Sequence, residues 1–496
     1  MVARFRILAL SHSARMDGAE QVFLETTRGL HRRGHTIHAV LPGRGPLATA
    51  LETAGVAVAF APLPWWILPP GELDAGHFLA QLGPQVAALR ERMQALQTDL
   101  VVSSTSVILH GALAAALEKR PHLWQVHEML GDPASGLDPT LGPAATWALL
   151  ARLSAPPRGR VVVASEAMRA LAASHLTGGA SGAERNLHCL PHGHDLSAFL
   201  ALPDAGAASA APPPRSGGGA KSRSPGSAAT SRRLVVIASI IPRKGLDWLI
   251  DLVADHLTPA ARGTNAAGAV PPFTIEVIGA AHDKGYLKQL QARAKARGVS
   301  ARFVWSGYCA DLPARLVGAR AVLHPSRNDP SPVGLILAMA AAKPIVATRC
   351  GGPEQMLTDG VSGRLVDRED AAGFAAAMRA LLTDPTHGAS WGAAARRQAV
   401  ATYGLEGYLD RFEALCGELV GGGEAAGDRE TCAADDGGLF AAILEACHRH
   451  VGAAGVTELK HLTPRQKKAL TGIVHGAKLL KKTLPAGLYD RLAGLW

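Results

Sequence analysis

Residues 6–42 read RILALSHSARMDGAEQVFLETTRGLHRRGHTIHAVLP, and this stretch decides the fold. RILALS (6–11) and TIHAVLP (36–42) are short runs of apolar or β-branched residues, and GAEQVFLETTRGLHRRG (18–34) between them has a helical pattern. Strands that are apolar throughout and alternate with helices are typical of a parallel sheet covered on both faces. The stretch therefore predicts a doubly wound α/β domain.

The same alternation continues along the chain and then starts again. The later apolar runs of the first half are DLVVSST (99–105), HLWQVHE (122–128) and GRVVVAS (159–165). Those of the second half are RLVVIAS (233–239), FTIEVIGA (273–280), ARFVWSGY (301–308), RAVLHPS (320–326), KPIVATRC (343–350) and GRLVD (363–367). We therefore expect two Rossmann-like domains facing a cleft, with a ligand bound outside the carboxyl ends of the strands.

At 496 residues the chain is too long for one hydrophobic core. We predict an N-terminal domain over residues 1–202 and a second domain over 234–420. The segment between them, 203–233, has almost no large apolar side chain and is predicted to be a disordered linker. Residues 421–496 are predicted to be a flexible stretch followed by a basic amphipathic helical tail.

The net charge of +10 is confined to two segments. Residues 203–233 carry five cations against one acid, which gives +4, and 461–496 carry seven against one, which gives +6. The rest of the chain is balanced, which excludes a basic nucleic-acid-binding face on a folded domain. The tail helix, 463–484, has one apolar stripe with lysines away from it. It fits either an anionic membrane surface or docking on its own protein.

Six cysteines are scattered without a C-x-x-C pair, which indicates neither a zinc site nor a disulfide framework. The apolar run near the N-terminus, 7–10, is too short for a signal peptide, and no run of about 18 apolar residues predicts a membrane span. We expect a cytoplasmic protein, peripheral at the membrane if the tail binds there.

Several residues follow predicted strands at the edge where a ligand is expected. Gly18 begins the first helix, where the backbone can approach a phosphate. Arg243 and Lys244 lie just ahead of a helix and would suit a diphosphate. Asp329 either caps the helix that follows it or bonds to sugar hydroxyls. His127 ends a strand and is either a packed residue or part of the site.

Taken together and in order, nine segments resemble the retaining glycosyltransferase family 4, whose members have the GT-B fold. The segments are SARMDGAE, the QVHE run, LPHGHDLSAF, PRKGLDWLI, VIGA, SGYCADLPARL, HPSRNDPSP, AMAAAKPIVAT and CGGPEQMLTDGVSGRLV. The resemblance covers residues 5 to about 418.

The resemblance implies transfer of a sugar from a nucleotide sugar, with a UDP- or GDP-sugar expected, to a glycan or lipid-linked acceptor held by the first domain. It implies that Lys244 pairs with the diphosphate, that Gly18 approaches it, and that His127 lies beside the donor sugar. Such enzymes retain the anomeric configuration and work without a metal or other cofactor, because cations and helix dipoles stabilise the leaving diphosphate. The chain has no D-x-D triplet.

The sequence departs from the family at its signature of two glutamates separated by seven residues. The alignment places Asp329 at the first position, near the transferred sugar, and Leu337 at the second, which normally bonds to the ribose. Pro332 and Val333, between them, are assigned to the donor site. The family often has Gly-Arg where this chain has Ala238 and Ser239, so that Arg243 becomes the candidate second phosphate cation.

The sequence leaves three other functions open. A non-catalytic GT-B protein that binds a saccharide or protein partner is favoured by Leu337 and Ser239. A GT-B sugar epimerase shares the paired domains but uses a different set of carboxylates. A dinucleotide dehydrogenase is disfavoured because no G-x-G-x-x-G follows the first strand of either domain.

Overall fold

The computed structural model describes residues 3–68, 75–132, 143–154, 158–176, 187–202, 232–258, 270–384 and 386–425. The described chain forms two compact units. The first takes the residues up to Pro191 and those from Tyr408 onward, and the second takes His192–Gly407. Most of the predicted linker, 203–231, and the tail helix, 463–484, lie outside the described residues.

The first unit is built on a seven-stranded sheet. Its strands are β1 (Arg6–Leu10), β2 (Thr36–Leu41), β3 (Ala57–Phe60), β4 (Leu100–Ser103), β5 (His122–Val126), β6 (Gly159–Val163) and β7 (Leu187–Cys189). Its helices are α1 (Gly18–Arg32), α2 (Pro46–Thr53), α3 (Ala75–Ala95), α4 (His110–Leu117), α5 (Pro143–Leu153), α6 (Glu166–Leu176) and most of α15 (Leu405–Ala425). The strand order is β3-β2-β1-β4-β5-β6-β7.

The second unit repeats this architecture with six strands in the order β10-β9-β8-β11-β12-β13. The strands are β8 (Arg233–Ile237), β9 (Thr274–Ile278), β10 (Phe303–Gly307), β11 (Ala321–His324), β12 (Ile345–Thr348) and β13 (Arg364–Val366). The α-helices are α7 (Ser197–Leu200), α8 (Leu246–Leu257), α9 (Lys284–Ala296), α10 (Leu312–Leu316), α11 (Val333–Ala340), α12 (Pro353–Met356), α13 (Ala371–Thr383) and α14 (Ala389–Tyr403). Two 3₁₀ turns, η4 (Pro242–Lys244) and η7 (Ser300–Arg302), complete it.

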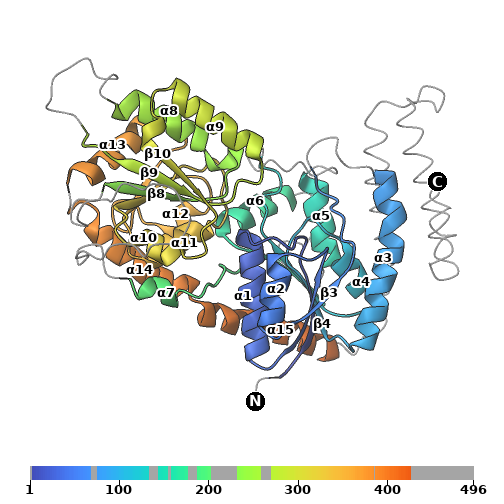
Figure 1. Cartoon of the computed structure of the whole chain (residues 1–496). Coiled ribbons are helices and arrows are strands. Elements are labelled where there is room, and N and C mark those ends of the chain that lie inside the picture. The colour runs from blue at the N-terminus through green and yellow to red at the C-terminus, as the bar shows by residue number, and fades with distance from the viewer. Residues whose placement is uncertain are drawn as a thin grey trace, which may run out of the picture. The chain divides into compact units, whose positions relative to one another are not determined.

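Every strand pairing in both sheets is parallel, and helices cover both faces of each sheet (Figure 1). The prediction of two doubly wound, Rossmann-like units is confirmed. All of the predicted strands quoted above are present. The edge strands β3 and β7 were not anticipated, since each is short and only partly buried.

The bounds of the compact units differ from the predicted bounds at residues 202 and 420. Residues from His192 join the second unit because Leu196 and Phe199 lie in the same apolar cluster as α11. Residues from Tyr408 join the first unit, where Tyr408 meets Thr26 of α1 at 3.1 Å. The predicted linker also ends later than the structure allows, because Arg233 is already the first residue of β8.

In both sheets the strand order reverses at one point, between β1 and β4 and between β8 and β11. At such a switch point the loops after the two strands diverge to opposite faces and leave a crevice outside the carboxyl ends. The predicted site residues Lys244 and Asp329 follow β8 and β11, and His127 follows β5, the neighbour of β4.

The core of the first unit holds histidines as well as apolar side chains. His122, at the start of β5, is buried between Ser154 Oγ at 3.2 Å from Nδ1 and Ser103 Oγ at 3.0 Å from Nε2. Burial lowers the pKa of His122 to about 3, and burial likewise lowers the pKa of His110 to about 4. Both imidazoles are therefore neutral in the folded protein at neutral pH.

We expect the first unit to lose stability on mild acidification. The folded pKa values of His110 and His122 lie below the unfolded value of about 6.5, so their contribution is complete above pH 6.5 and is lost as the pH falls toward 4. Between pH 6.5 and 5 each histidine should lower the free energy of unfolding by about 2 kcal/mol. Urea unfolding of wild type and His122→Gln at pH 7 and pH 5 checks this. The variant should start less stable but depend less on pH, and an equal pH dependence of the two proteins would refute it.

Candidate functional site

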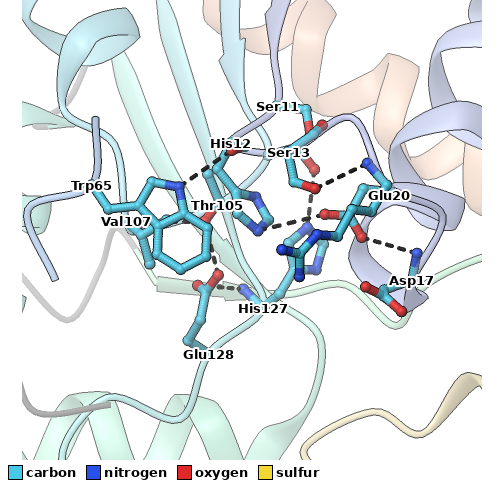
Figure 2. Close-up of polar contacts among 12 residues, drawn as sticks. Ser11, His12, Ser13, Asp17, Glu20, Trp65, Thr105, Val107, His127 and Glu128 are labelled. Carbon is cyan, nitrogen blue, oxygen red and sulfur yellow. Dashed lines mark hydrogen bonds and ion pairs between the residues drawn. The ribbon is translucent and has the colours of Figure 1, made fainter. Parts of the chain in front are cut away.

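In the first unit the loops after β1, β4 and β5 bring polar side chains together (Figure 2). His127 follows β5 directly, as predicted, and its Nε2 lies 2.9 Å from Ser104 Oγ of the loop after β4. Burial lowers the pKa of His127 to about 4, with Glu128 opposing that shift and His12 adding to it. His127 is therefore a neutral imidazole at pH 7, with one ring nitrogen that donates a hydrogen bond and one that accepts.

Glu128, the neighbour of His127, fixes the loop after β4. Its carboxylate accepts hydrogen bonds from Thr105 Oγ1 at 2.8 Å, Ser106 Oγ at 2.6 Å and Ser106 N at 3.1 Å. It also accepts one from the backbone N–H of His127 at 3.2 Å. Burial alone would raise the pKa of Glu128, but His127 and His12, when they carry charge, and these hydrogen bonds lower it overall. An ionised Glu128 thus holds two loops in register.

His12, in the loop after β1, links this cluster to the start of α1. Its Nε2 lies 3.5 Å from Glu20 Oε1, and its backbone carbonyl accepts a hydrogen bond from Trp65 Nε1 at 3.2 Å (Figure 2). The two aromatic rings lie 5.1 Å apart. The other oxygen of Glu20 accepts from Asp17 N at 3.2 Å, just ahead of Gly18, which is the exposed first residue of α1 as predicted.

In the second unit the turn after β8 and the loop after β11 form one charged cluster. Lys244 Nζ forms a hydrogen bond and ion pair with Asp329 Oδ2. Arg243 lies 3.5 Å from Asp329 Oδ1, and His324 Nε2 lies 3.3 Å from Oδ2. Only 10% of the Lys244 side chain and 5% of the Asp329 side chain are exposed, so the pair is largely withdrawn from water.

The charge of Asp329 is fixed by its neighbours. Burial alone would raise the pKa of this carboxyl, but Lys244, His324 and Arg243 hold it far below its usual range. Asp329 is also tied through its backbone, since its N–H donates to Cys350 O at 3.0 Å and its C=O accepts from Gly352 N at 2.8 Å. Asp329 does not cap α11, where the N-cap is Pro332.

Gly245 sets how closely the turn and the loop approach. Its φ of +66° is left-handed, and a Cβ there would lie 2.0 Å from Pro325 O. The same approach is held by Arg327 N donating to Arg243 O at 2.8 Å and Arg243 Nη1 donating to Asn328 O at 2.9 Å. The cationic turn therefore depends on glycine at position 245.

The remaining predicted donor residues lie at the start of α11. Pro332 is buried, and its carbonyl accepts from Leu335 N at 2.9 Å, while Val333 is the half-buried first helical residue. Leu337, one turn on, is 7% exposed and packs in an apolar cluster with Leu196 and Met356. The position expected to bond the ribose is thus part of the hydrophobic core.

Sequence reasoning missed Glu128, His12, Glu20 and His324, although Glu128 and Glu20 lie within the quoted QVHE and SARMDGAE and His324 ends β11. The residues next to them in the sequence gave no signal, because their side-chain partners come from other parts of the chain. Over the described ranges, no group of three or more His, Cys, Asp or Glu side chains is arranged to hold a metal ion. Within the same ranges, no helix is both long enough and apolar enough to span a membrane.

Two doubly wound, parallel-sheet units in one chain are the architecture of the GT-B fold. Residues 16–198 match the family model described as Glycosyltransferase Family 4, and residues 220–398 match the one described as Glycosyl transferases group 1. The chain belongs to glycosyltransferase family 4, as the sequence resemblance implied.

Curated relatives share part of the chain. A GDP-mannose-dependent alpha-(1-6)-phosphatidylinositol monomannoside mannosyltransferase of Mycolicibacterium smegmatis is 31% identical over 176 residues, which cover 34% of this chain and 43% of that protein. A D-inositol 3-phosphate glycosyltransferase of Geodermatophilus obscurus is 31% identical over 155 residues, covering 30% of this chain and 33% of that protein. The matches thus span less than half of the length of these relatives.

Solved structures share the fold. A crystal structure of Anabaena Alr3699/HepE in complex with UDP has a TM-score of 0.64 at 20% identity, and the match covers 84% of this chain and 100% of that one. Sucrose-phosphate synthase from Thermosynechococcus elongatus has a TM-score of 0.61 at 15% identity, with 84% and 100% covered.

Replacing Gly245 should destabilise the cationic turn, which is formed by Arg243 and Lys244 after β8. The loss of stability should exceed the loss that a left-handed backbone conformation alone would cause. Gly245→Ala combines a φ of +66° with a contact to Pro325 O, whereas the control Gly360→Ala has a φ of +74° and nothing within 4 Å. We expect Gly360→Ala to lower the free energy of unfolding by about 1–2 kcal/mol and Gly245→Ala to lower it further. Urea unfolding measures both, and equal losses would show that the approach of the loop to the turn is not constrained.

Proposed function

We propose that the chain is a retaining, metal-independent hexosyltransferase that moves a sugar from a nucleotide sugar to a saccharide or lipid-linked acceptor. The observation that carries this proposal is the cationic turn at the switch point of the second unit, in which Lys244 is buried and Arg243 is partly buried. Lys244 and Arg243 lie there on one carboxylate, outside the carboxyl ends of β8 and β11. Family membership supplies the reaction class.

The charge balance of the cluster suits a diphosphate leaving group. Lys244, Arg243 and Asp329 carry two positive charges against one negative, so the cluster has one positive charge to offer, besides His324 when protonated. A diphosphate gains negative charge as the glycosidic bond breaks, and preorganised cations in a water-poor site stabilise that charge. Lys244 and Arg243 are the residues that we assign to this task.

The identity of the donor rests on the relatives. The mycobacterial relative is named as GDP-mannose-dependent, and Anabaena Alr3699/HepE has been solved with UDP, with UDP and glucose, and with UDP-glucose. These names favour a UDP- or GDP-hexose for this chain.

Asp329 is assigned to sugar hydroxyls rather than to covalent catalysis. A carboxylate whose negative charge is held by Lys244, Arg243 and His324 is a weak nucleophile but a good hydrogen-bond acceptor. His127, neutral at pH 7, is assigned to the donor sugar, as the family resemblance implies. Retention of configuration then depends on the donor diphosphate and not on a glycosyl-carboxylate intermediate.

The acceptor is assigned to the first unit. Trp65, the ring of His12 and the carboxylates of Glu20 and Glu128 offer an apolar face beside hydrogen-bonding groups, which is a combination that suits a sugar or polyol. A lipid-linked acceptor would agree with membrane attachment through residues 463–484, which we keep as part of the proposal.

A second candidate, a non-catalytic GT-B protein, is favoured by one observation. Leu337 is in the apolar cluster of α11. The carboxylate that would accept a hydrogen bond from the ribose is therefore replaced by an apolar side chain. The two candidates differ in whether a nucleotide sugar is turned over.

Purified full-length protein should release nucleoside diphosphate from at least one UDP- or GDP-hexose when an acceptor is present. Lys244→Ala should lower kcat/KM by roughly 100-fold or more, because one preorganised charge is removed from the leaving group. Arg293→Ala, which breaks an exposed ion pair of α9 with Asp251, is the matched control and should leave activity unchanged. If the protein neither binds nor turns over any of the UDP- and GDP-hexoses tested, the transferase is excluded and the binding protein is favoured.

Introducing the glutamate that the family has at position 337 should destabilise the protein, because the carboxylate would be buried. Leu337→Glu places a carboxylate in an apolar cluster and should lower the free energy of unfolding by about 1–3 kcal/mol without nucleotide. If the position faces the ribose, UDP or GDP should raise the Tm of this variant more than that of wild type, and Leu337→Met should behave like wild type. An equal nucleotide-induced shift in all three proteins would show that position 337 does not meet the ribose.

A further inference from the structure

A continuous series of buried hydrogen bonds joins His127 to helix α1 within the first unit. The series runs through α1, β5, α15 and the loops after β4 and β5, in the order His127, Ser104, Gln125, Tyr408, Thr26 and the carbonyl of Val22. Ser104, Gln125, Tyr408 and Thr26 are each at most 4% exposed. Because water hardly reaches these groups, the number of hydrogens they own decides which atom donates at each link.

The direction of the series is set at its α1 end. Thr26 Oγ1 donates its one hydrogen to Val22 O at 2.7 Å, a bond back along the helix. The oxygen of Thr26 can therefore only accept at its 3.1 Å contact with Tyr408 OH. Tyr408 must be the donor in that contact. Burial raises the pKa of Tyr408 well above its usual range, so its hydroxyl keeps this hydrogen.

The remaining links follow from this first one. Since Tyr408 spends its hydrogen on Thr26, Gln125 Nε2 donates to Tyr408 OH at 2.7 Å. The amide oxygen of Gln125 then accepts from Ser104 Oγ at 3.1 Å. Ser104 has no second hydrogen, so at its 2.9 Å contact with His127 Nε2 the histidine is the donor.

We propose that the series from Thr26 through Tyr408, Gln125 and Ser104 fixes His127 as the tautomer protonated on Nε2. Nδ1 is then the acceptor nitrogen of a neutral ring. Tyr408, Gln125 and Ser104 are positioning residues that act through His127. Tyr408 lies 283 residues after Gln125 in the sequence. The tautomer of His127 is therefore set by α15, at the far end of the described chain.

The consequence for catalysis rests on the proposed function. Nε2 of His127 already donates to Ser104, so a substrate hydroxyl offered to this nitrogen meets a donor that is in use and not an acceptor. The backbone bond from His127 N to Glu128 Oε2 at 3.2 Å holds the same residue from its other side. The ring is therefore fixed in both orientation and tautomer before any ligand arrives.

Helix α1 offers a matched pair of substitutions for testing the proposal. Thr26 and Thr27 are both buried and both donate a hydrogen bond of 2.7 Å to the carbonyl four residues back, but only Thr26 also contacts Tyr408. Thr26→Val frees the hydrogen of Tyr408 to turn toward Gln125, whose amide can rotate and reverse every later link. Thr27→Val removes an equivalent hydroxyl and leaves the series intact.

The tautomer is read by long-range ¹H–¹⁵N NMR on full-length protein labelled at histidine, with His127→Gln identifying the signal. Wild type and Thr27→Val should show protonated Nε2, whereas Thr26→Val and Tyr408→Phe should show a population protonated on Nδ1. Protonated Nδ1 in wild type, or an unchanged His127 pattern in both Thr26→Val and Tyr408→Phe, would overturn the proposal.

A kinetic measurement separates this proposal from the proposed function. If the protein transfers sugar, Thr26→Val should lower kcat more than Thr27→Val at a similar Tm, with little change in the KM for the donor. If no donor is turned over while the NMR patterns are as expected, the proposed function fails and the assignment of the tautomer stands.

Discussion

Both sheets of this protein are entirely parallel, and the position of every functional side chain follows from that constraint. Two parallel strands cannot be joined by a tight turn, so each connection crosses over through a helix and all strands of a sheet end at the same edge. Loops after β1, β4 and β5 therefore gather His12, Ser104 and His127, and loops after β8 and β11 gather Lys244 and Asp329. The reversal of strand order then opens space between the diverging loops.

Within the second unit, a buried charge holds this edge together. Asp329 is withdrawn from water, and an isolated carboxylate there would be strongly disfavoured. Its pairing with Lys244 and Arg243 ties the turn after β8 to the loop after β11, and Gly245 allows the two backbones to approach. A diphosphate at this position would compete with Asp329 for the same cations, so the ion pair links the folding of the site to its proposed chemistry.

The first unit uses neutral groups instead. Its candidate site is organised by hydrogen bonds among serine, threonine, glutamine and tyrosine hydroxyls and amides, and the carboxylate adjacent to His127, that of Glu128, is bound by several donors. Each neutral group has a fixed number of hydrogens to donate. In a buried series of such groups, the donor-to-acceptor direction of the first hydrogen bond therefore sets the direction of all the others. Helix α15 returns to this unit and supplies Tyr408, which gives the C-terminal part of the described chain a place in the candidate site.

The sequence by itself determined the two doubly wound units, because apolar strands alternating with amphipathic helices leave few other ways to bury both faces of a sheet. It also placed His127, Lys244 and Asp329 after the carboxyl ends of strands and Gly18 at the start of the first helix. Only the tertiary structure decided that Lys244 and Asp329 pair with each other, that Leu337 packs in the core, and that Tyr408 reaches Gln125 across 283 residues. Those contacts join segments far apart in the chain, and periodicity and motif spacing report only on neighbours in sequence.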